Sequence, residues 1–338
     1  MTNTLSIGLS AGLASALLFA SVSTGSAFAM ALFYAAPLPI LITGLGWRHY
    51  GALLAAVTAA AVLALALNPI FLVAFLAGIG VPAWLLAYLA LLARPNARGE
   101  LEWYPVGRLL FWAAMIAAAG VSVGVIGLGT SETAYTAALR GIVEQVLRLQ
   151  TDTPADKPLA LPGVEDVDAA VKLMVVVLPL TAAVLSMLTV LLNLWGAGRV
   201  VRASGRLVRP WPDLTEVRMP AFAATVFAAV ALLSLLGGLV GILAGLFAAT
   251  LAVAYSLTGL SLLHAITRGY SGRGFMLATS YVAIMLFGWP LLFFVFAGLA
   301  DAFLDIRRRQ PGSRGPSGPK GPLGPGNPPP APPAANDQ

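Results

Sequence analysis

Apolar residues fill long stretches of this chain, and polar residues are confined to the short segments between them. A helix that crosses the hydrocarbon core of a bilayer needs roughly 20 mostly apolar residues. Stretches of this kind lie at residues 5–22, 27–46, 51–67, 70–93, 109–129, 170–195, 221–243, 245–265 and 275–300. They lack the alternation typical of strands, and lipid requires each segment to satisfy its own backbone hydrogen bonds. The pattern therefore predicts an all-α fold, a polytopic transmembrane helix bundle of about 8–10 spans.

The composition agrees with a protein whose solvent is largely lipid. Hydrophobic residues make up 59% of the 338 residues and charged residues only 10%. A typical soluble domain carries about a quarter charged residues. The net charge of +6 is explained by basic residues gathered on the cytoplasmic side of a membrane, so we expect no nucleic-acid partner. Because the chain has no cysteine, disulfides, thiolate metal sites and cysteine nucleophiles are excluded.

The charges between the stretches set the expected orientation. Arginines follow the second, fourth and sixth stretches, and the loop 196–220 carries five of them. The segment 130–169, after the fifth stretch, has seven acidic residues against three basic ones. The positive-inside rule therefore places the loop 196–220 inside, the segment 130–169 outside and the N-terminus in the cytoplasm. We expect the first stretch to remain as a helix, since residues 1–6 lack the basic residues of a signal peptide, although Ala27-Phe28-Ala29 resembles a cleavage site.

The last stretches conflict with this alternation. Arg268 and Arg273 follow the eighth stretch, and the arginines 307–309 follow the ninth, so a single crossing cannot leave both groups inside. Either residues 275–300 form a broken hairpin that turns at Gly288-Trp289-Pro290, or one of the two groups faces outward. The stretch is short for two full crossings at about 1.5 Å per residue. We expect the arginines 307–309 to lie inside.

Two regions are predicted to lie outside the bilayer. Between residues 132 and 149, apolar residues recur at helical spacing opposite Arg140, Glu144 and Arg148, which predicts an amphipathic helix on the outer face. Residues 310–338 consist almost entirely of Pro, Gly, Ser and Ala, which is typical of a disordered tail. The expected organisation is a membrane domain at residues 1–309, including the outer segment 130–169 and the inner loop 196–220, followed by the tail.

Sequence motifs give little support to an enzyme. Gly120-Val121-Ser122-Val123-Gly124 matches the G-x-S-x-G pattern of serine hydrolases, but that motif needs a strand-to-helix turn and a nearby base. Residues 109–129, 173–195 and 221–263 contain no Asp, Glu, Lys, Arg or His. Ion-coupled pumps usually place such groups within the membrane. We therefore expect no enzyme, no self-sufficient pump, no metal and no cofactor.

A few polar residues remain as candidates for ligand binding or helix packing. They are Asn193, Tyr255, Thr258, His264 and Asp301. For Asn193 a hydrogen bond between helices is the commoner role, and for Asp301 an ion pair at the membrane edge. Arg199, Arg202, Arg206 and Arg209 are spaced three or four residues apart, which predicts one stripe on a juxtamembrane helix. Such a stripe is expected to rest on anionic lipid headgroups or, in the alternative interpretation, to dock a cytoplasmic protein partner or a polyanionic ligand.

Several short segments together resemble one family. They are Leu178-Pro179, Asn193-Leu194-Trp195-Gly196-Ala197-Gly198-Arg199, Met219-Pro220, Tyr255-Ser256-Leu257-Thr258-Gly259-Leu260-Ser261 with His264, and Gly298-Leu299-Ala300-Asp301 with Asp305 and Arg307. In this order they resemble the YybS-like family of bacterial polytopic membrane proteins, a domain of unknown function. Thr258 stands where the family pattern leads us to expect Gln. The resemblance implies a multi-pass protein of the bacterial inner (cytoplasmic) membrane.

The family's general plan is similar to the substrate-binding membrane components of energy-coupling-factor transporters. Such a component binds a small molecule within its helices, while a separate ATPase supplies the energy. The resemblance therefore implies a small-molecule-binding or transport-accessory bundle. The alternative is a membrane scaffold or assembly factor that acts through protein or lipid contacts.

Overall fold

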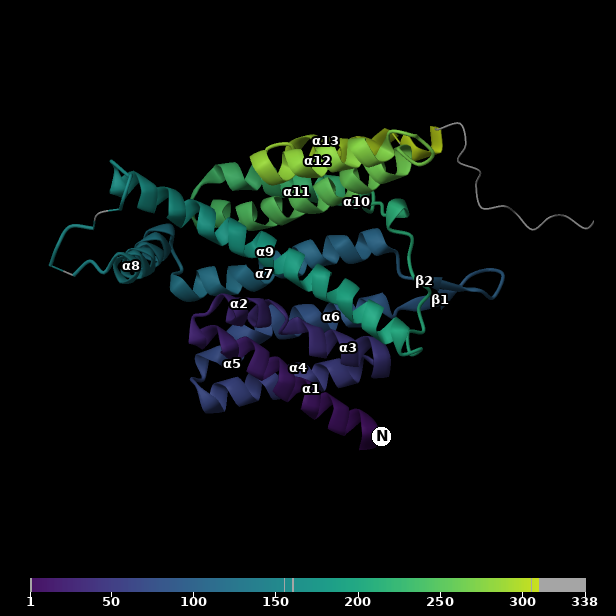
Figure 1. The fold of residues 1–338 in the computed structure, drawn as a ribbon, viewed down its shortest axis with the longest axis horizontal. Coiled ribbons are helices and arrows are strands. Elements are labelled where there is room, and N and C mark those ends of the chain that lie inside the picture. Colours follow the sequence, from purple (N-terminus) through teal and green to yellow (C-terminus); the bar gives the residue numbers. More distant parts are fainter. Residues whose placement is uncertain (1, 155, 160, 305, 310–338) are drawn as a thin grey trace, which may run out of the picture.

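The computed structural model describes residues 2–154, 156–159, 161–304 and 306–309, and shows long helices that run side by side in one direction (Figure 1). The helices are α1 (Thr2–Ala20), α2 (Ala27–Tyr34), α3 (Pro37–Trp47), α4 (His49–Ala66), α5 (Ile70–Phe75), α6 (Val81–Ala90), α7 (Val106–Leu128), α8 (Glu132–Thr151), α9 (Val167–Ala203), α10 (Phe222–Leu233), α11 (Gly238–Ile266), α12 (Arg273–Phe287) and α13 (Leu291–Leu304). Short helical turns are η1 (Ser21–Thr24), η2 (Leu76–Gly80), η3 (Leu214–Glu216), η4 (Ser234–Leu236) and η5 (Ile306–Arg309). Two short strands, β1 (Ala93–Pro95) and β2 (Leu101–Trp103), pair antiparallel.

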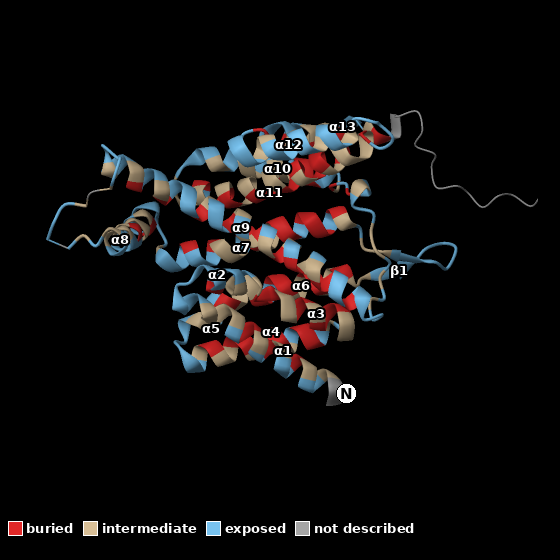
Figure 2. Cartoon of the chain, in the orientation of Figure 1, coloured by how far each residue is buried: buried red, intermediate tan, exposed pale blue. Residues whose placement is uncertain are grey.

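The predicted polytopic helix bundle is confirmed. Seven helical segments in the described part of the chain are long and apolar enough to cross a membrane, and three shorter apolar helices accompany them. Figure 2 shows buried residues where the helices meet and many exposed residues on their outward faces. Large apolar side chains such as Leu192, Met285 and Phe287 are among the exposed ones. A lipid environment explains this exposure, because lipid tails are as apolar as leucine.

The second predicted span is interrupted before Pro37, where side chains of other helices bond the exposed backbone carbonyls. Pro37 begins α3 after a short interruption that separates it from α2. At this break, the carbonyl of Tyr34 accepts a hydrogen bond from Asn193 Nδ2 of α9 at 2.8 Å. The carbonyl of Ala36 accepts one from Ser15 Oγ of α1 at 2.6 Å. Neighbouring helices thus satisfy the backbone groups that a proline break exposes, as the bilayer requires.

The turn between the helices at residues 221–265 lies earlier than predicted. Gly237 and Gly238 adopt φ values of +69° and +65°, a backbone conformation that glycine accepts without steric cost. The turn therefore falls at these two residues and not near residue 244. As a consequence, α10 is short and α11 extends over 29 residues.

The broken hairpin is the correct alternative for residues 275–300. They form the two short helices α12 and α13, which meet at Gly288 (φ +69°), Trp289 and Pro290. Arg268 pairs with Asp213, and Arg307 donates to the carbonyl of Thr215 in the same loop. Both therefore lie at the same end of the bundle, which is also the end of the β1–β2 hairpin and of the start of α1, whereas α8 lies at the opposite end (Figure 1). This arrangement removes the conflict in the charge pattern. That the basic end faces the cytoplasm stays a prediction from the positive-inside rule.

The amphipathic helix predicted at residues 132–149 is confirmed as α8. Ser131 caps its N-terminus by accepting a hydrogen bond from the Ala134 N–H, and Tyr135 and Val143 are its buried residues. Burial raises the pKa of the Tyr135 hydroxyl. Arg140 forms ion pairs with Glu144 at 2.7 Å and with Asp168 of α9 at 2.5 Å, which join α8 to the start of α9. The predicted disordered tail, residues 310–338, lies outside the described residues, as does Asp305.

Candidate functional site

A cavity of about 660 Å³ lies between α7, α9, α11 and the loop that follows α9. It is near the end of the bundle that carries the β1–β2 hairpin (Figure 1). The helix α9 crosses the bundle obliquely, and the loop covers the space beside its end. The side chains that line the cavity are mainly apolar, among them Leu109, Leu110, Leu191 and Leu257. In size and in lining it resembles pockets that bind small molecules, which measure about 300–1,000 Å³.

The covering loop begins where α9 is forced to end. The N–H of Arg206 donates to the Val201 carbonyl, and the N–H of Gly205 donates to the Arg202 carbonyl, while Gly205 has φ +70°. This pair of hydrogen bonds with a left-handed glycine is a Schellman motif, which terminates a helix. The prediction of one helical stripe through Arg199, Arg202, Arg206 and Arg209 is therefore wrong for its second half. Arg206 and Arg209 lie in the loop, because Gly205 ends the helical order before them.

Arginines and carbonyl groups fix the loop over the cavity. Arg209 is half-buried and donates to the carbonyl of Ala90 at 3.0 Å and to that of Tyr104 at 2.8 Å. Its burial lowers the pKa of its guanidinium. Asp213 pairs with Arg268 at 2.9 Å, and this contact holds the pKa of the Asp213 carboxyl at about 2. These contacts tie the loop to α6, to the β1–β2 hairpin and to the end of α11.

A buried ion pair beside the loop, between Arg307 and Asp301, also holds the loop in place. Arg307 Nε lies 3.0 Å from Asp301 Oδ2, and both side chains are more than nine-tenths buried. The N–H is not aimed at that oxygen, so the contact is an ion pair without a well-aligned hydrogen bond. Arg307 also donates to the carbonyls of Thr215 and Thr258. The pair therefore joins α11, α13 and the loop, and burial lowers the pKa of Arg307.

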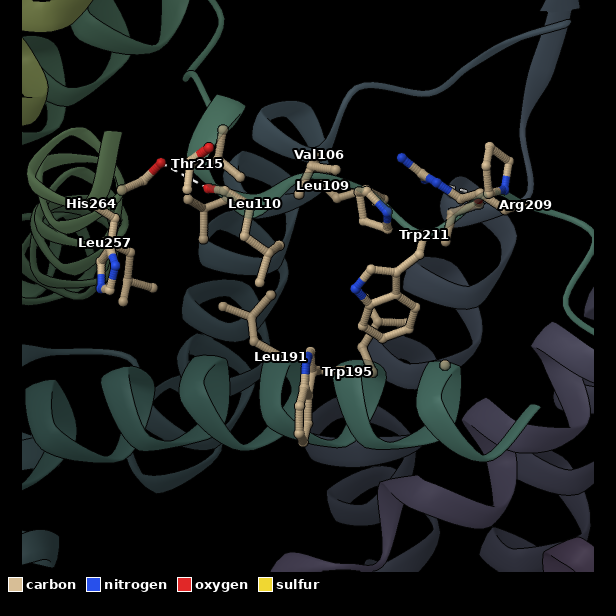
Figure 3. A pocket seen from close by; sticks show the side chains of 18 of the residues that line it. Val106, Leu109, Leu110, Leu191, Trp195, Arg209, Trp211, Thr215, Leu257 and His264 are labelled. Atoms are coloured by element: carbon tan, nitrogen blue, oxygen red, sulfur yellow. Dashed lines mark hydrogen bonds between the residues drawn. The ribbon is translucent and has the colours of Figure 1, made fainter. Parts of the chain in front are cut away.

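The polar groups of the cavity lie at its two ends. In Figure 3, His264 and Leu257 stand at one end, Trp211 and Arg209 at the other, and Leu110 and Leu191 between them. His264 Nε2 lies 2.8 Å from the hydroxyl of Tyr281, a contact that links α11 to α12. Apart from this contact α12 is loosely attached, since none of its residues is buried. The arrangement suits a ligand with an apolar body and at least one polar end.

At the Arg209 end of the cavity, several arginines pack against tryptophan rings and form a cluster of positive charge. The guanidinium of Arg199 lies 5.8 Å from the rings of both Trp195 and Trp211, and that of Arg202 lies 5.4 Å from Trp211. Arg206 stacks on Trp47 at 4.7 Å. Within the described residues, Arg199, Arg202 and Arg206 form no ion pair with a carboxylate. Trp195 and Trp211 also line the cavity, so the cluster and the cavity share a wall.

Of the five polar candidates, His264 is the one that lines the cavity. Asn193 is buried and bonds the carbonyls of Tyr34 and Thr189, which confirms the predicted interhelical role. Tyr255 is fully buried with its ring 5.6 Å from that of Phe227. Thr258 donates to the Tyr255 carbonyl at 2.8 Å. Asp301 forms an ion pair with Arg307, and that this pair lies at the membrane edge stays a prediction.

Thr258, Asp301 and the backbone carbonyl of Tyr255 thus belong to the contact between α11 and α13, and none of these residues lines the cavity. Two glycines allow this contact. A Cβ atom on Gly298 would lie 2.2 Å from the carbonyl oxygen of Tyr255, and one on Gly259 would lie 2.0 Å from that of Phe294. The segments of α11 and α13 that carry the family resemblance therefore meet in space as a packing interface.

Ser122 has the surroundings of a packing residue. Its hydroxyl is buried and donates to the carbonyl of Ala118 in the same helix, and Ser122 lies within α7 and not at a strand-to-helix turn. A Cβ on Gly120 would lie 2.4 Å from the carbonyl oxygen of Ala77. The small residues of this motif let α7 approach the η2 turn closely. Among the described residues there is also no group of three His, Asp or Glu side chains that could hold a metal.

Sequence reasoning did not single out Trp211 and Tyr281, and it named Trp195 and Arg307 without assigning them a contact. Arg209-Pro210-Trp211-Pro212 was a usable signal, because prolines and a tryptophan beside a basic residue are typical of a fixed interfacial loop. Ser204-Gly205 was also a usable signal for the end of α9. No local pattern predicts that Tyr281 contacts His264 or that Arg307 reaches the carbonyls of Thr215 and Thr258.

A family model described as "Predicted membrane protein (DUF2232)" matches residues 13–302. This range includes every residue that lines the cavity. The YybS-like resemblance of the sequence is consistent with this match. No curated protein and no solved structure matches the chain.

Proposed function

The chain belongs to the DUF2232 family of predicted membrane proteins, and we propose that this multi-pass bundle binds a small molecule in the cavity between α7, α9 and α11. The cavity is the single observation that carries the proposal. Its apolar walls suit the body of a ligand, and His264 and Arg209 at its ends supply polar contacts. Pockets that bind small molecules share this combination of apolar walls with a few polar groups.

The bundle serves as a substrate-binding or transport-accessory component in a bacterial inner membrane, with its basic end in the cytoplasm. The membrane spans α7, α10 and α11 hold few ionisable residues, and residues 109–129 and 221–263 hold none. Such groups normally carry the coupling in ion-driven transporters. A separate protein would therefore have to supply the energy for any movement of the ligand.

The test compares two neighbouring residues of α9. Leu191 lines the cavity, whereas the side chain of Leu192 is 67% exposed on the outer face. Leu191→Trp fills the cavity, and Leu192→Trp is the matched control with the same change in volume on the lipid side. The three proteins are purified in a mild detergent and analysed by native mass spectrometry for a bound small molecule.

We expect the wild type and Leu192→Trp to carry the same adduct and Leu191→Trp to lose it. An adduct that persists in Leu191→Trp would place the ligand elsewhere and overturn the proposal. Absence of any adduct from a freshly extracted wild type would also count against it. In that case the scaffold role gains support, since α12 buries none of its residues, and crosslinking should recover one stoichiometric protein partner.

A further inference from the structure

We propose that the ligand is an anionic amphiphile, whose phosphate or carboxylate group binds at Arg209 and the Arg199–Arg202–Trp211 rim while its apolar body fills the cavity. This inference rests on the proposed function and specifies the ligand class of the same site. The shared chemistry is a negatively charged head on an apolar body. A membrane lipid and a non-lipid amphiphile both have that chemistry.

The first argument is an excess of positive charge at one end of the cavity. Arg209 lines the cavity, and within the described residues its guanidinium donates two hydrogen bonds, both to neutral carbonyl groups, those of Ala90 and Tyr104. A guanidinium has five N–H donors, so others remain available to a ligand. A half-buried cation without a carboxylate partner is costly, and a bound anion would offset that cost. Burial accordingly lowers the pKa of Arg209.

The second argument is that nearby arginines differ in how they are neutralised. Arg268 is paired with Asp213, and Arg307 is paired with Asp301. By contrast, Arg199 and Arg202 have tryptophan rings and no carboxylate as partners among the described residues. Both side chains are exposed. The fold therefore neutralises the arginines on the α11 and α13 side and leaves those on the α9 side free to bind an anion.

The third argument is that Trp211 physically joins the charged rim to the apolar cavity. Its ring lies against Gly198, where a Cβ atom would come within 3.3 Å of the ring. The same ring lines the cavity and contacts the guanidiniums of Arg199 and Arg202. Indole rings favour the boundary between headgroups and hydrocarbon. A ligand lying along Trp211 would place its charged head beside the arginines and its body among Leu110, Leu191 and Leu257.

The experiment uses two probes with the same alkyl chain, dodecyl phosphate and the uncharged dodecanol. Binding to the full-length protein in a neutral detergent is measured by native mass spectrometry. The test variant is Arg199→Gln with Arg202→Gln, two exposed residues whose loss leaves no described hydrogen bond broken. Arg94→Gln with Arg98→Gln, two exposed arginines of the β1–β2 hairpin at the same end, is the control matched for net charge. Arg209→Gln provides a separate test of the buried group.

We expect dodecyl phosphate to bind more tightly than dodecanol and to lose at least about tenfold in affinity in the Arg199→Gln/Arg202→Gln variant, because charge-assisted hydrogen bonds to the anionic head are lost. Arg94→Gln with Arg98→Gln should bind like the wild type. Equal binding of the two probes, abolished by Leu191→Trp, would overturn the anionic ligand and leave the proposed function intact. Failure of both probes to bind would count against both proposals.

A further arm distinguishes the two sources of the ligand. Phosphatidylglycerol and phosphatidylcholine are offered in separate nanodiscs that contain the protein, and competition with dodecyl phosphate is measured. Displacement by phosphatidylglycerol but not by phosphatidylcholine assigns the site to an anionic membrane lipid. Retention of dodecyl phosphate in both nanodiscs assigns it to a non-lipid amphiphile. Displacement by both lipids equally would show that charge does not decide binding and would overturn the inference.

Discussion

The close contact between α11 and α13 predicts that replacing Gly259 of α11 by alanine lowers the stability of the protein, whereas the same substitution at Gly124, an exposed residue of α7, does not. In Gly259→Ala the new Cβ would lie 2.0 Å from the Phe294 carbonyl oxygen, whereas ordinary contact begins at 3.4 Å. The two backbones must therefore separate by more than 1 Å at this point, since no side chain can rotate away. In Gly124→Ala, on the exposed face of α7, nothing lies within 4 Å of the new atom.

The magnitude follows from two competing effects. Forcing an extra methyl group into a packed interface costs about 1–3 kcal/mol, and a backbone obstacle places Gly259→Ala at the upper end. Replacing glycine by alanine within a helix returns roughly 0.5–1 kcal/mol. We therefore expect Gly259→Ala to lower the stability by about 2 kcal/mol, since strain exceeds the propensity gain. Gly124→Ala should be neutral or slightly stabilising.

The assay is the midpoint of thermal unfolding in detergent, followed by the intrinsic fluorescence of the tryptophans. Gly298→Ala serves as an independent second variant, because its Cβ would lie 2.2 Å from the Tyr255 carbonyl oxygen on the opposite helix. Both interface variants should unfold at lower temperature than Gly124→Ala. If Gly259→Ala melts at or above the temperature of Gly124→Ala, the close contact of α11 and α13 does not exist as described.

Three further outcomes test the loop, the buried ion pair and the topology. The pKa of about 2 at Asp213 lies below its ordinary value of 3.8, so the contact of Asp213 with Arg268 stabilises the protein above about pH 4 and is lost as the pH falls toward 2. The difference in melting temperature between the wild type and Asp213→Asn should shrink over that range, and a constant difference would contradict the contact. Arg307→Met leaves the Asp301 carboxylate buried without its partner and should lower the free energy of unfolding by about 3–5 kcal/mol, and adding Asp301→Asn should restore part of that loss. Equal melting temperatures for the single and double variants would argue against the pair. In intact cells, a cysteine at Ser271, in the turn between α11 and α12, should resist an impermeant thiol reagent while one at Thr153, after α8, reacts. Labelling of both from one side would refute the placement of these two turns at opposite ends of the bundle or the orientation.

The sequence anticipated much of the fold but located its turns less well. Apolar length identified the spans, and the positive-inside rule exposed the conflict that the α12–α13 hairpin resolves. The helix boundaries that were predicted wrongly are set by glycines with positive φ. Gly237 and Gly238 place the turn between α10 and α11 earlier than predicted, and Gly205 ends α9 inside the predicted arginine stripe. These glycines are visible in the sequence, but a glycine-rich chain offers many similar positions, and only a few adopt positive φ.

The candidate site was anticipated only in part. His264 was among the predicted residues and lines the cavity, and Asn193 and Asp301 have the structural roles expected of them. The contacts of Arg307 were not predicted, because two of its partners, Thr258 and Thr215, are far from it in the chain. The pairing depends on how α11, α13 and the loop approach one another. Such an approach leaves no periodic pattern in the chain.

The sequence by itself determined that this protein lies in a membrane, that it is helical, and where its apolar segments run. Those properties follow from local composition, because transfer into lipid and backbone hydrogen bonding act on each segment separately. The tertiary structure alone decided which arginines are neutralised, which helices meet at glycines, and that a cavity remains beside α9. These features depend on the crossing of helices and on contacts between residues far apart in the chain, where side-chain volume and charge act across helices and not along them.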